Sequence, residues 1–233
     1  MSKDKRHTSV AVLFDIDGTL VDSNYLHVAA WIRAFTDAGI PVDAWRIHRS
    51  IGMDGTTLLS TLAEGADDDT RARAKDLHSQ YYKETASLLR PLPGARELLE
   101  AVEKLGVQVV LATSAPDDEL AILRDVLDCD SLVSAVTSSE DVDTAKPRPD
   151  IINVALERAG VEAAHAVFVG DAVWDVEACK RADVVTIALL SGGVSKCELE
   201  DAGAHQVFED ARDLCQHLDD TPIAALANLV GAR

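Results

Sequence analysis

The sequence lacks the short-range residue patterns that bind zinc and similar metals. Its four cysteines are spread widely over 233 residues and include no Cys-x-x-Cys pair. Its seven histidines form no His-x-x-x-His motif or similar cluster. Zinc sites use thiolate and imidazole ligands at such spacings, so we expect no zinc site and no histidine-bound metal. The cysteines are expected to be reduced thiols in helices or in the core.

Positive charge and long apolar runs are also scarce. The chain has 22 lysines and arginines against 40 acidic residues, which gives a formal net charge of −18. Such an excess repels nucleic acid and anionic membranes, and no apolar stretch is long enough to span a bilayer. Residues 1–9 are polar and lack the apolar segment of a signal peptide. We therefore expect a cytoplasmic protein with no nucleic-acid partner and no membrane contact.

The stretch from Val10 to Ser23 is the most informative part of the chain. A short apolar run ends at Asp15 and Asp17, and Gly18 and a threonine follow. A continuous apolar run of this length is typical of a strand buried on both faces of a parallel sheet. Ligands of open α/β sheets bind beyond the carboxyl ends of such strands, so the two carboxylates are expected at the functional site. An Asp-Gly pair is also an ordinary turn dipeptide, which is the simplest alternative.

The segment that follows this strand reads as helical throughout. The pattern predicts helices over residues 25–38, 43–50 and 56–63, and one long helix over residues 67–89 that is closed by Pro91 and Pro93. Residues 22–89 are therefore expected to form a smaller all-helical domain inserted into the rest of the chain. Trp31 and Trp45 are expected to pack in the core of this domain.

From Gly94 onward, helical and strand patterns alternate. Helices are predicted over residues 96–105, 116–127, 149–159, 173–182 and 211–218, and strands over residues 107–112, 132–136, 165–169, 184–189 and 206–208. Strands separated by helices predict an α/β fold with a doubly wound, mostly parallel sheet. Residues 1–21 and 90–233 are expected to form this larger domain, and 47% hydrophobic residues suffice for a sizeable core.

Three further polar signals lie at or near predicted strand ends. Thr113 and Ser114 follow one strand, and Asp171 follows another in a Gly-Asp-x-x-x-Asp pattern that also contains Asp175. Lys146 lies in a Lys-Pro-Arg-Pro segment just before a helix. Each of these pieces alone is typical of a solvated loop.

Together these four segments resemble, in order, motifs I to IV of the haloacid dehalogenase superfamily of phosphatases and phosphomutases. The resemblance spans about residues 10–210 and implies a Rossmann-like core with an inserted helical cap and a bound Mg²⁺. It implies that Asp15 is the nucleophile and a metal ligand, that Asp17 contributes its backbone carbonyl to the metal, and that Asp171 contributes its side chain. Asp175 would bind through a metal-bound water or brace Lys146.

The resemblance also implies roles in catalysis. The Asp17 side chain would protonate the leaving alkoxide and then deprotonate the water that hydrolyses the aspartyl-phosphate. Thr113 or Ser114 would donate hydrogen bonds to phosphoryl oxygens, and Lys146 would balance the developing charge. The cap would open and close about hinges near residues 22–23 and 89–93.

These features predict a Mg²⁺-dependent phosphatase that acts on a small phosphorylated metabolite, such as a sugar phosphate or phosphoglycolate, as a monomer or homodimer. The alternatives are a phosphomutase that resembles β-phosphoglucomutase and a non-catalytic binding protein on the same scaffold. A dehalogenase is disfavoured because Asp17 would have no alkoxide to protonate. A phosphonate hydrolase is disfavoured because the resembling enzymes lack the second aspartate.

Charge in the predicted cap bears on the choice between phosphatase and mutase. A mutase must hold a bisphosphate at both ends, which requires a cation in the cap. Where the resembling mutases have an arginine, this chain has Gly55, and Asp54 beside it adds a repelling charge. The candidates for a compensating cation are His48, Arg49, Lys75 and Lys83. We expect a phosphatase.

Overall fold

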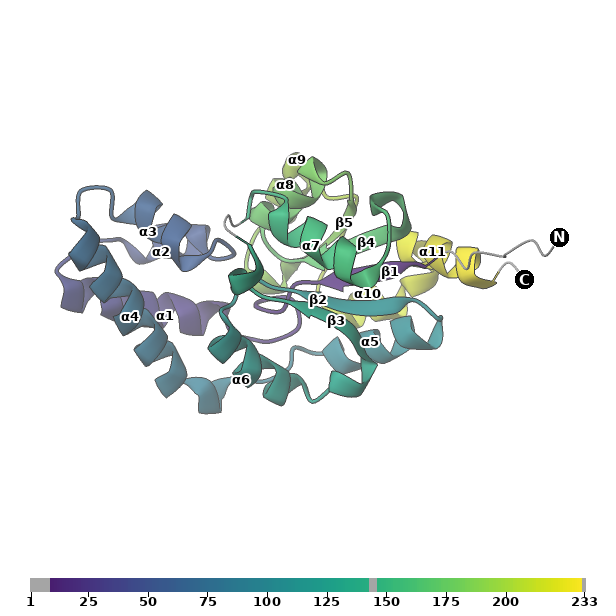
Figure 1. Ribbon diagram of the computed structural model, residues 1–233, viewed down its shortest axis with the longest axis horizontal. Helices are drawn as coiled ribbons and strands as arrows, with labels where there is room; N and C mark the ends of the chain where they lie inside the picture. Colours follow the sequence, from purple (N-terminus) through teal and green to yellow (C-terminus); the bar gives the residue numbers. More distant parts are fainter. Residues whose placement is uncertain (1–8, 143–145, 232–233) are drawn as a thin grey trace.

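The computed structural model describes residues 9–142 and 146–231. At its centre is a six-stranded parallel sheet with the order β3-β2-β1-β4-β5-β6 (Figure 1). The strands are β1 (Ala11–Phe14), β2 (Gln108–Ala112), β3 (Val133–Thr137), β4 (Ala166–Gly170), β5 (Val185–Leu189) and β6 (Gln206–Phe208). This arrangement confirms the predicted doubly wound α/β fold class.

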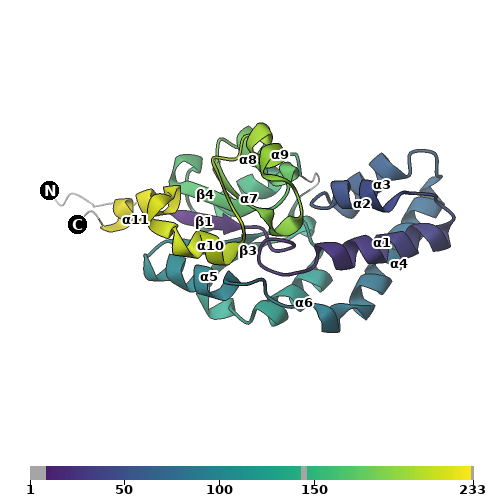
Figure 2. The ribbon, with the colours of Figure 1, turned by 180° about the vertical axis from the view of Figure 1, so that it is seen from behind.

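Helices cover both faces of this sheet, as the views from opposite sides show (Figures 1 and 2). One face is covered by α5 (Ala95–Lys104), α6 (Asp117–Leu127) and α10 (Ala211–Gln216), and the other by α7 (Asp150–Ala159) and α8 (Val173–Arg181). Val12 and Phe14 pack against the first set of helices, whereas Leu13 packs against the second. Successive side chains of a strand point to opposite faces of the sheet. Because helices cover both faces, every residue of β1 is buried.

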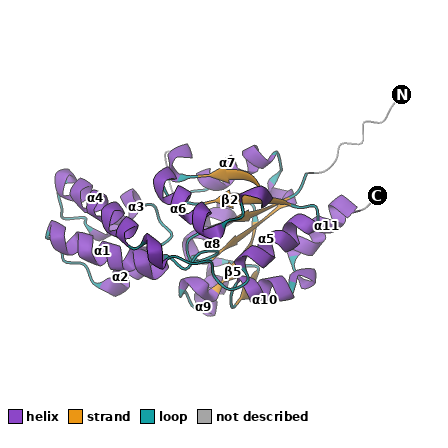
Figure 3. Ribbon diagram, turned by 90° about the horizontal axis from the view of Figure 1, so that it is seen from below, coloured by secondary structure: helices purple, strands orange, loops and turns teal. Residues whose placement is uncertain are grey.

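Four helices form a separate group beyond the carboxyl ends of the strands (Figure 3). They are α1 (Asn24–Ala38), α2 (Ala44–Ser50), α3 (Gly55–Leu62) and α4 (Asp68–Glu84). This group has its own apolar cluster, which includes Trp31, Phe35 and Leu58. We call these four helices the cap. The division of the chain into domains at residues 22 and 89 stays a prediction.

Several local expectations need correction. Trp45 is 67% exposed and does not pack in the cap core, although Trp31 does. The expected long helix ends at Glu84, and a short 3-10 turn, Ala86–Leu88, follows it. Two helices were not expected: α9 (Lys196–Ala202) and α11 (Pro222–Gly231).

The structure bears on only one of the expectations about location and assembly, the absence of a membrane span. Among the described residues, no helix has the length and apolar character needed to cross a bilayer. The polar N-terminal stretch, on which the expectation of no signal peptide depends, lies outside the described residues apart from Ser9. The cytoplasmic location and the monomeric or homodimeric state stay predictions.

Candidate active site

Asp15 lies at the centre of the sheet edge that faces the cap. It directly follows β1, and its backbone N–H donates a hydrogen bond to the carbonyl of Val169 in β4 at 2.9 Å. The residue is 5% exposed, and its Oδ1 accepts a hydrogen bond of 2.7 Å from Lys146 Nζ. Burial, with the nearby carboxylates of Asp175 and Asp17, raises the Asp15 pKa to about 7 despite the lysine.

Lys146 is a buried cation that joins two carboxylates. Its side chain is 1% exposed, and its Nζ lies 2.7 Å from Asp15 Oδ1 and 2.7 Å from Asp175 Oδ1. Burial alone would lower the lysine pKa, but the two carboxylates outweigh it and raise the pKa above its usual value. Lys146 is therefore charged and holds both carboxylates in place.

Asp171 and Asp175 follow β4 on the same edge of the sheet. Asp171 Oδ1 accepts a hydrogen bond from Thr19 Oγ1 at 3.0 Å, and its Oδ2 accepts one from Asn24 Nδ2 at 2.8 Å. Asp175 Oδ2 accepts hydrogen bonds from the backbone N–H groups of Asp171 and Ala172 at 3.2 and 3.1 Å. Both oxygens of Asp175 are thus already engaged, one by Lys146 and one by the backbone.

Two glycines allow the chain to come close to Asp171. Gly18 has a φ of +72°, and a Cβ there would lie 2.4 Å from Asp171 Oδ2. A Cβ at Gly192 would lie 1.8 Å from the same oxygen. Any larger residue at Gly192 would have to displace the Asp171 carboxylate, so glycine is required there for steric reasons.

The carboxylates of Asp15, Asp171 and Asp175 form a buried group that could hold a cation. One oxygen from each lies within 4.8 Å of the others. Burial is the main cause that raises the Asp171 pKa well above its usual value, and the charges of Asp175 and Asp15 add to it. Three buried carboxylates with one lysine leave an excess of negative charge, which a hard divalent cation with oxygen ligands would relieve. The donor set therefore fits Mg²⁺.

Asp17 has a different environment from Asp15. Its Oδ1 accepts a 2.5 Å hydrogen bond from Ser23 Oγ and lies 3.3 Å from Nε2 of His27. Burial opposes ionisation, but the hydrogen bonds from His27 and Ser23 and the charge of His27 outweigh it and lower the Asp17 pKa. Ser23 directly precedes α1, but its side chain makes no capping hydrogen bond to the helix and contacts Asp17 instead.

A second histidine from the cap supports His27. Nδ1 of His27 lies 3.1 Å from Nε2 of His78, and the two rings stack on Tyr82 and Trp31, respectively. Burial and the charge of His27 lower the His78 pKa well below its usual value, whereas the contact with Asp17 raises the His27 pKa in spite of burial. A charged His27 that donates to Asp17 and to a neutral His78 satisfies both contacts.

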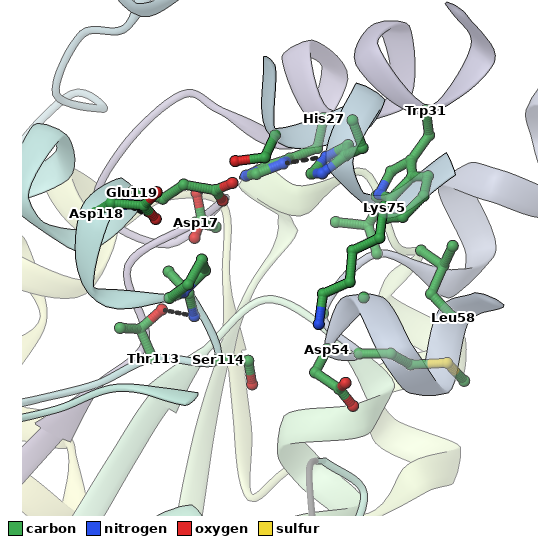
Figure 4. Close-up of a pocket in the computed structure, with 18 of the residues that line it drawn as sticks. Asp17, His27, Trp31, Asp54, Leu58, Lys75, Thr113, Ser114, Asp118 and Glu119 are labelled. Atoms are coloured by element: carbon green, nitrogen blue, oxygen red, sulfur yellow. Dashed lines mark hydrogen bonds and ion pairs between the residues drawn. The ribbon is translucent and has the colours of Figure 1, made fainter. Parts of the chain in front are cut away.

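These residues open into a cavity of about 330 Å³ between the cap and the sheet edge. Thr113 and Ser114 line it from the loop after β2, and Thr113 is buried with its Oγ1 accepting a hydrogen bond from the Ala115 backbone N–H at 3.0 Å. Figure 4 shows Asp17 facing this space between Glu119 of α6 and His27 of the cap. The cavity therefore brings Asp15, Asp17, Thr113 and Ser114 together with cap residues.

Contacts between cap and core surround this cavity. The Arg49 guanidinium pairs with Glu198, and the Lys83 ammonium pairs with Asp118. His48 Nε2 lies 3.2 Å from the carbonyl oxygen of Gly192, next to Asp171. These contacts hold the cap over the site.

Sequence reasoning missed the histidine pair and Glu119. His27 and His78 are 51 residues apart on different helices, so no local spacing links them. Glu119 is only 4% exposed, although it lies in a charged helix turn that reads as solvated. Burial raises its pKa. The available signal was that α1, which contains His27, begins directly after the stretch that carries Asp15 and Asp17.

Comparisons with known proteins place the chain as a whole. The family model described as haloacid dehalogenase-like hydrolase matches residues 12–189. A phosphoglycolate phosphatase from Pseudomonas savastanoi is 29% identical over 210 residues, which is 87% of this chain and 77% of that protein. A phosphorylated carbohydrates phosphatase from Thermotoga maritima is 31% identical, over 76% of this chain and 83% of that one. The crystal structure of a hydrolase from Pseudomonas syringae is 39% identical with a TM-score of 0.87, over 91% and 99% of the two chains.

Proposed function

This chain belongs to the haloacid dehalogenase-like hydrolases and is a phosphoric monoester hydrolase, and we propose that it hydrolyses a small phosphorylated metabolite with Mg²⁺ through a phosphoenzyme on Asp15. The observation that carries the proposal is the contrast between two carboxylates two residues apart, Asp15, which is buried, and Asp17, which is half-buried. Asp15 is held by Lys146, whereas Asp17 is held by Ser23 and His27. Two carboxylates in such different environments suit a nucleophile and a proton carrier, respectively.

The metal site would lie among the buried carboxylates at this edge of the sheet. Asp15 and Asp171 would hold Mg²⁺ with the backbone carbonyl of Asp17, and the bound ion would neutralise the charge between the carboxylate nucleophile and the phosphate. Asp175 has both oxygens engaged by Lys146 and by backbone N–H groups. We therefore assign Asp175 the role of positioning Lys146.

The protein's own groups account for the two chemical steps. An Asp15 oxygen forms a bond to phosphorus while the bond to the leaving oxygen breaks, and Asp17 passes to that oxygen the proton that His27 donates in their hydrogen bond. A water then attacks phosphorus, gives its proton to Asp17, and releases Asp15. Because Asp17 and His27 share a hydrogen bond, Asp17 can exchange a proton with His27 in both steps. Thr113 and Ser114 would donate hydrogen bonds to phosphoryl oxygens.

The two chain segments that connect cap and core support a hinge. Asp22 N–H donates to the Arg90 carbonyl at 3.0 Å, and Leu92 N–H donates to the Leu20 carbonyl at 2.9 Å. These hydrogen bonds hold the two connecting segments side by side, so the cap can rotate as a rigid body about this one pair of segments. Closure of the cap would exclude bulk water from the phosphoenzyme.

Turnover of p-nitrophenyl phosphate with Mg²⁺ tests the proposal. Asp15→Asn should abolish turnover because an amide cannot form the phosphoenzyme. Asp183→Asn is the matched control, since Asp183 precedes β5 at the opposite edge of the sheet and has a φ of 56° that asparagine tolerates. Wild-type rates in purified Asp15→Asn, or equal losses in both variants, would contradict the proposed function.

A further inference from the structure

A second cavity continues outward from the first. Its volume is about 520 Å³, and it lies between the cap and the segment around α7. The two cavities share the lining residues Asp54, Gly55, Lys75, Ser114 and Pro116. Together they offer far more room than a two-carbon leaving group such as glycolate fills.

The charge of the lining changes between the two cavities. Beyond Asp15 and Asp17, the first cavity is lined by the carboxylates of Asp54, Asp76, Asp118, Glu119 and Glu140. Among the described residues that line the second cavity, Asp54 is the only acid, and Lys75 and Arg148 are cations. A second anionic group on the substrate, besides the phosphate at Asp15, is therefore disfavoured in the first cavity and favoured in the second.

Lys75 is the cap cation that lies where the two cavities meet, so it can contact an anionic group in the second cavity. Its side chain extends from α4 into the cavity toward Asp54 (Figure 4), and its Nζ donates a hydrogen bond to Thr56 Oγ1 at 3.3 Å. The other candidate cations of the cap are engaged by the core: Arg49 by Glu198, Lys83 by Asp118, and His48 by Gly192. Within the described part of the chain, Lys75 has no ion pair.

We propose that the second cavity binds an anionic group at the far end of the substrate, between Lys75 of the cap and Arg148 of the core. This inference rests on the proposed function and narrows its substrate class to phosphate monoesters that carry a second anion, either a carboxylate or another phosphate. The uncharged, hydroxyl-bearing middle of the substrate lies in the first cavity, where carboxylates accept its hydrogen bonds. Because Lys75 and Arg148 come from cap and core, one anion between them also favours the closed cap.

Calorimetric binding to the Asp15→Asn protein with Mg²⁺ tests this inference without turnover. One pair of probes is 6-phosphogluconate and sorbitol 6-phosphate, which differ by a terminal carboxylate against a hydroxymethyl group. A second pair, fructose 1,6-bisphosphate and fructose 6-phosphate, tests a second phosphate. The member with the second anion should bind about tenfold more tightly than its partner in at least one pair, as expected for one charge-assisted hydrogen bond. The pair that shows the preference identifies the anion.

Variants assign the preference to its residues. Adding Lys75→Gln or Arg148→Gln should reduce the preference and leave unchanged the binding of the probe that has one phosphate and no second anion. Lys104→Gln is the control, because Lys104 lies on α5 and pairs with Glu100 at the surface. No preference in either pair, or equal weakening of both members by Lys75→Gln, would overturn the inference. Failure of the proposed function is seen separately, as absence of p-nitrophenyl phosphate turnover by the wild type.

Discussion

Asp175→Asn separates a positioning role from metal ligation. Asp175 Oδ1 lies 2.7 Å from Lys146 Nζ, and Oδ2 accepts hydrogen bonds from two backbone N–H groups. Asparagine has the same shape but only one acceptor oxygen. Its NH₂ group must therefore face either the lysine ammonium or the backbone donors, and one of these contacts is lost.

The size of the effect follows from burial. Both side chains are 1% exposed, and removing one partner of a buried ion pair costs about 3–5 kcal/mol. Lys146 keeps its second partner, Asp15, so we expect the lower figure, about 3 kcal/mol. For a chain of this length each kcal/mol lowers the Tm by about 2–4 °C, which predicts a fall of about 6–12 °C.

Two assays measure the consequence. Thermal unfolding followed by circular dichroism gives the Tm, and p-nitrophenyl phosphate hydrolysis at increasing Mg²⁺ gives kcat and the half-saturating Mg²⁺ concentration. Asp175→Asn should lower kcat about ten- to a hundredfold and leave the Mg²⁺ requirement unchanged. Asp171→Asn, the matched control, should raise that requirement. Two results would refute the positioning role: a half-saturating Mg²⁺ concentration that rises as much in Asp175→Asn as in Asp171→Asn, or a Tm of Asp175→Asn equal to that of the wild type.

Three further predictions follow from the same contacts. Asp17→Asn should reduce hydrolysis of an alkyl phosphate by about a hundredfold or more but spare p-nitrophenyl phosphate, whose leaving group needs no acid; equal losses would contradict an acid role. Ca²⁺ should inhibit because it prefers a larger oxygen shell than Mg²⁺, so activation by Ca²⁺ would count against the metal site. His78 has a lowered pKa, so only the unfolded chain gains a proton as the pH falls below about 6.5. Its contribution to stability should be present above that pH and lost below it, by up to about 1.4 kcal/mol per pH unit in urea titrations, and identical pH profiles of wild type and His78→Gln would contradict this.

The sheet edge was predictable from the sequence because strand geometry is local. Each parallel strand shows as a short apolar run, and residues after such runs must meet at one edge. Asp15 directly follows β1, Thr113 directly follows β2 and Asp171 directly follows β4. The structure places all three on that edge. The boundaries of the strands after β1 differ from the predicted ones by at most one residue, and those of β6 agree at both ends.

Side-chain partners across the cap were beyond sequence reasoning. Contacts such as His27 with His78, or Arg49 with Glu198, depend on how the cap docks on the core, and no spacing rule encodes that docking. The exposure of Trp45 has the same origin, since its helix alone does not show which face meets the other cap helices. The helix α11 was missed because its short apolar sequence shows no clear helical period.

Trapping the phosphoenzyme tests the central claim most directly. Wild-type protein mixed with Mg²⁺ and excess p-nitrophenyl phosphate is quenched in acid within the first turnovers, digested, and analysed by mass spectrometry. Our account predicts a phosphoryl group on the peptide that contains Asp15, located on that residue and absent from Asp15→Asn. Turnover without a phosphorylated peptide in rapid-quench samples, or a phosphoryl group on a residue other than Asp15, would contradict it.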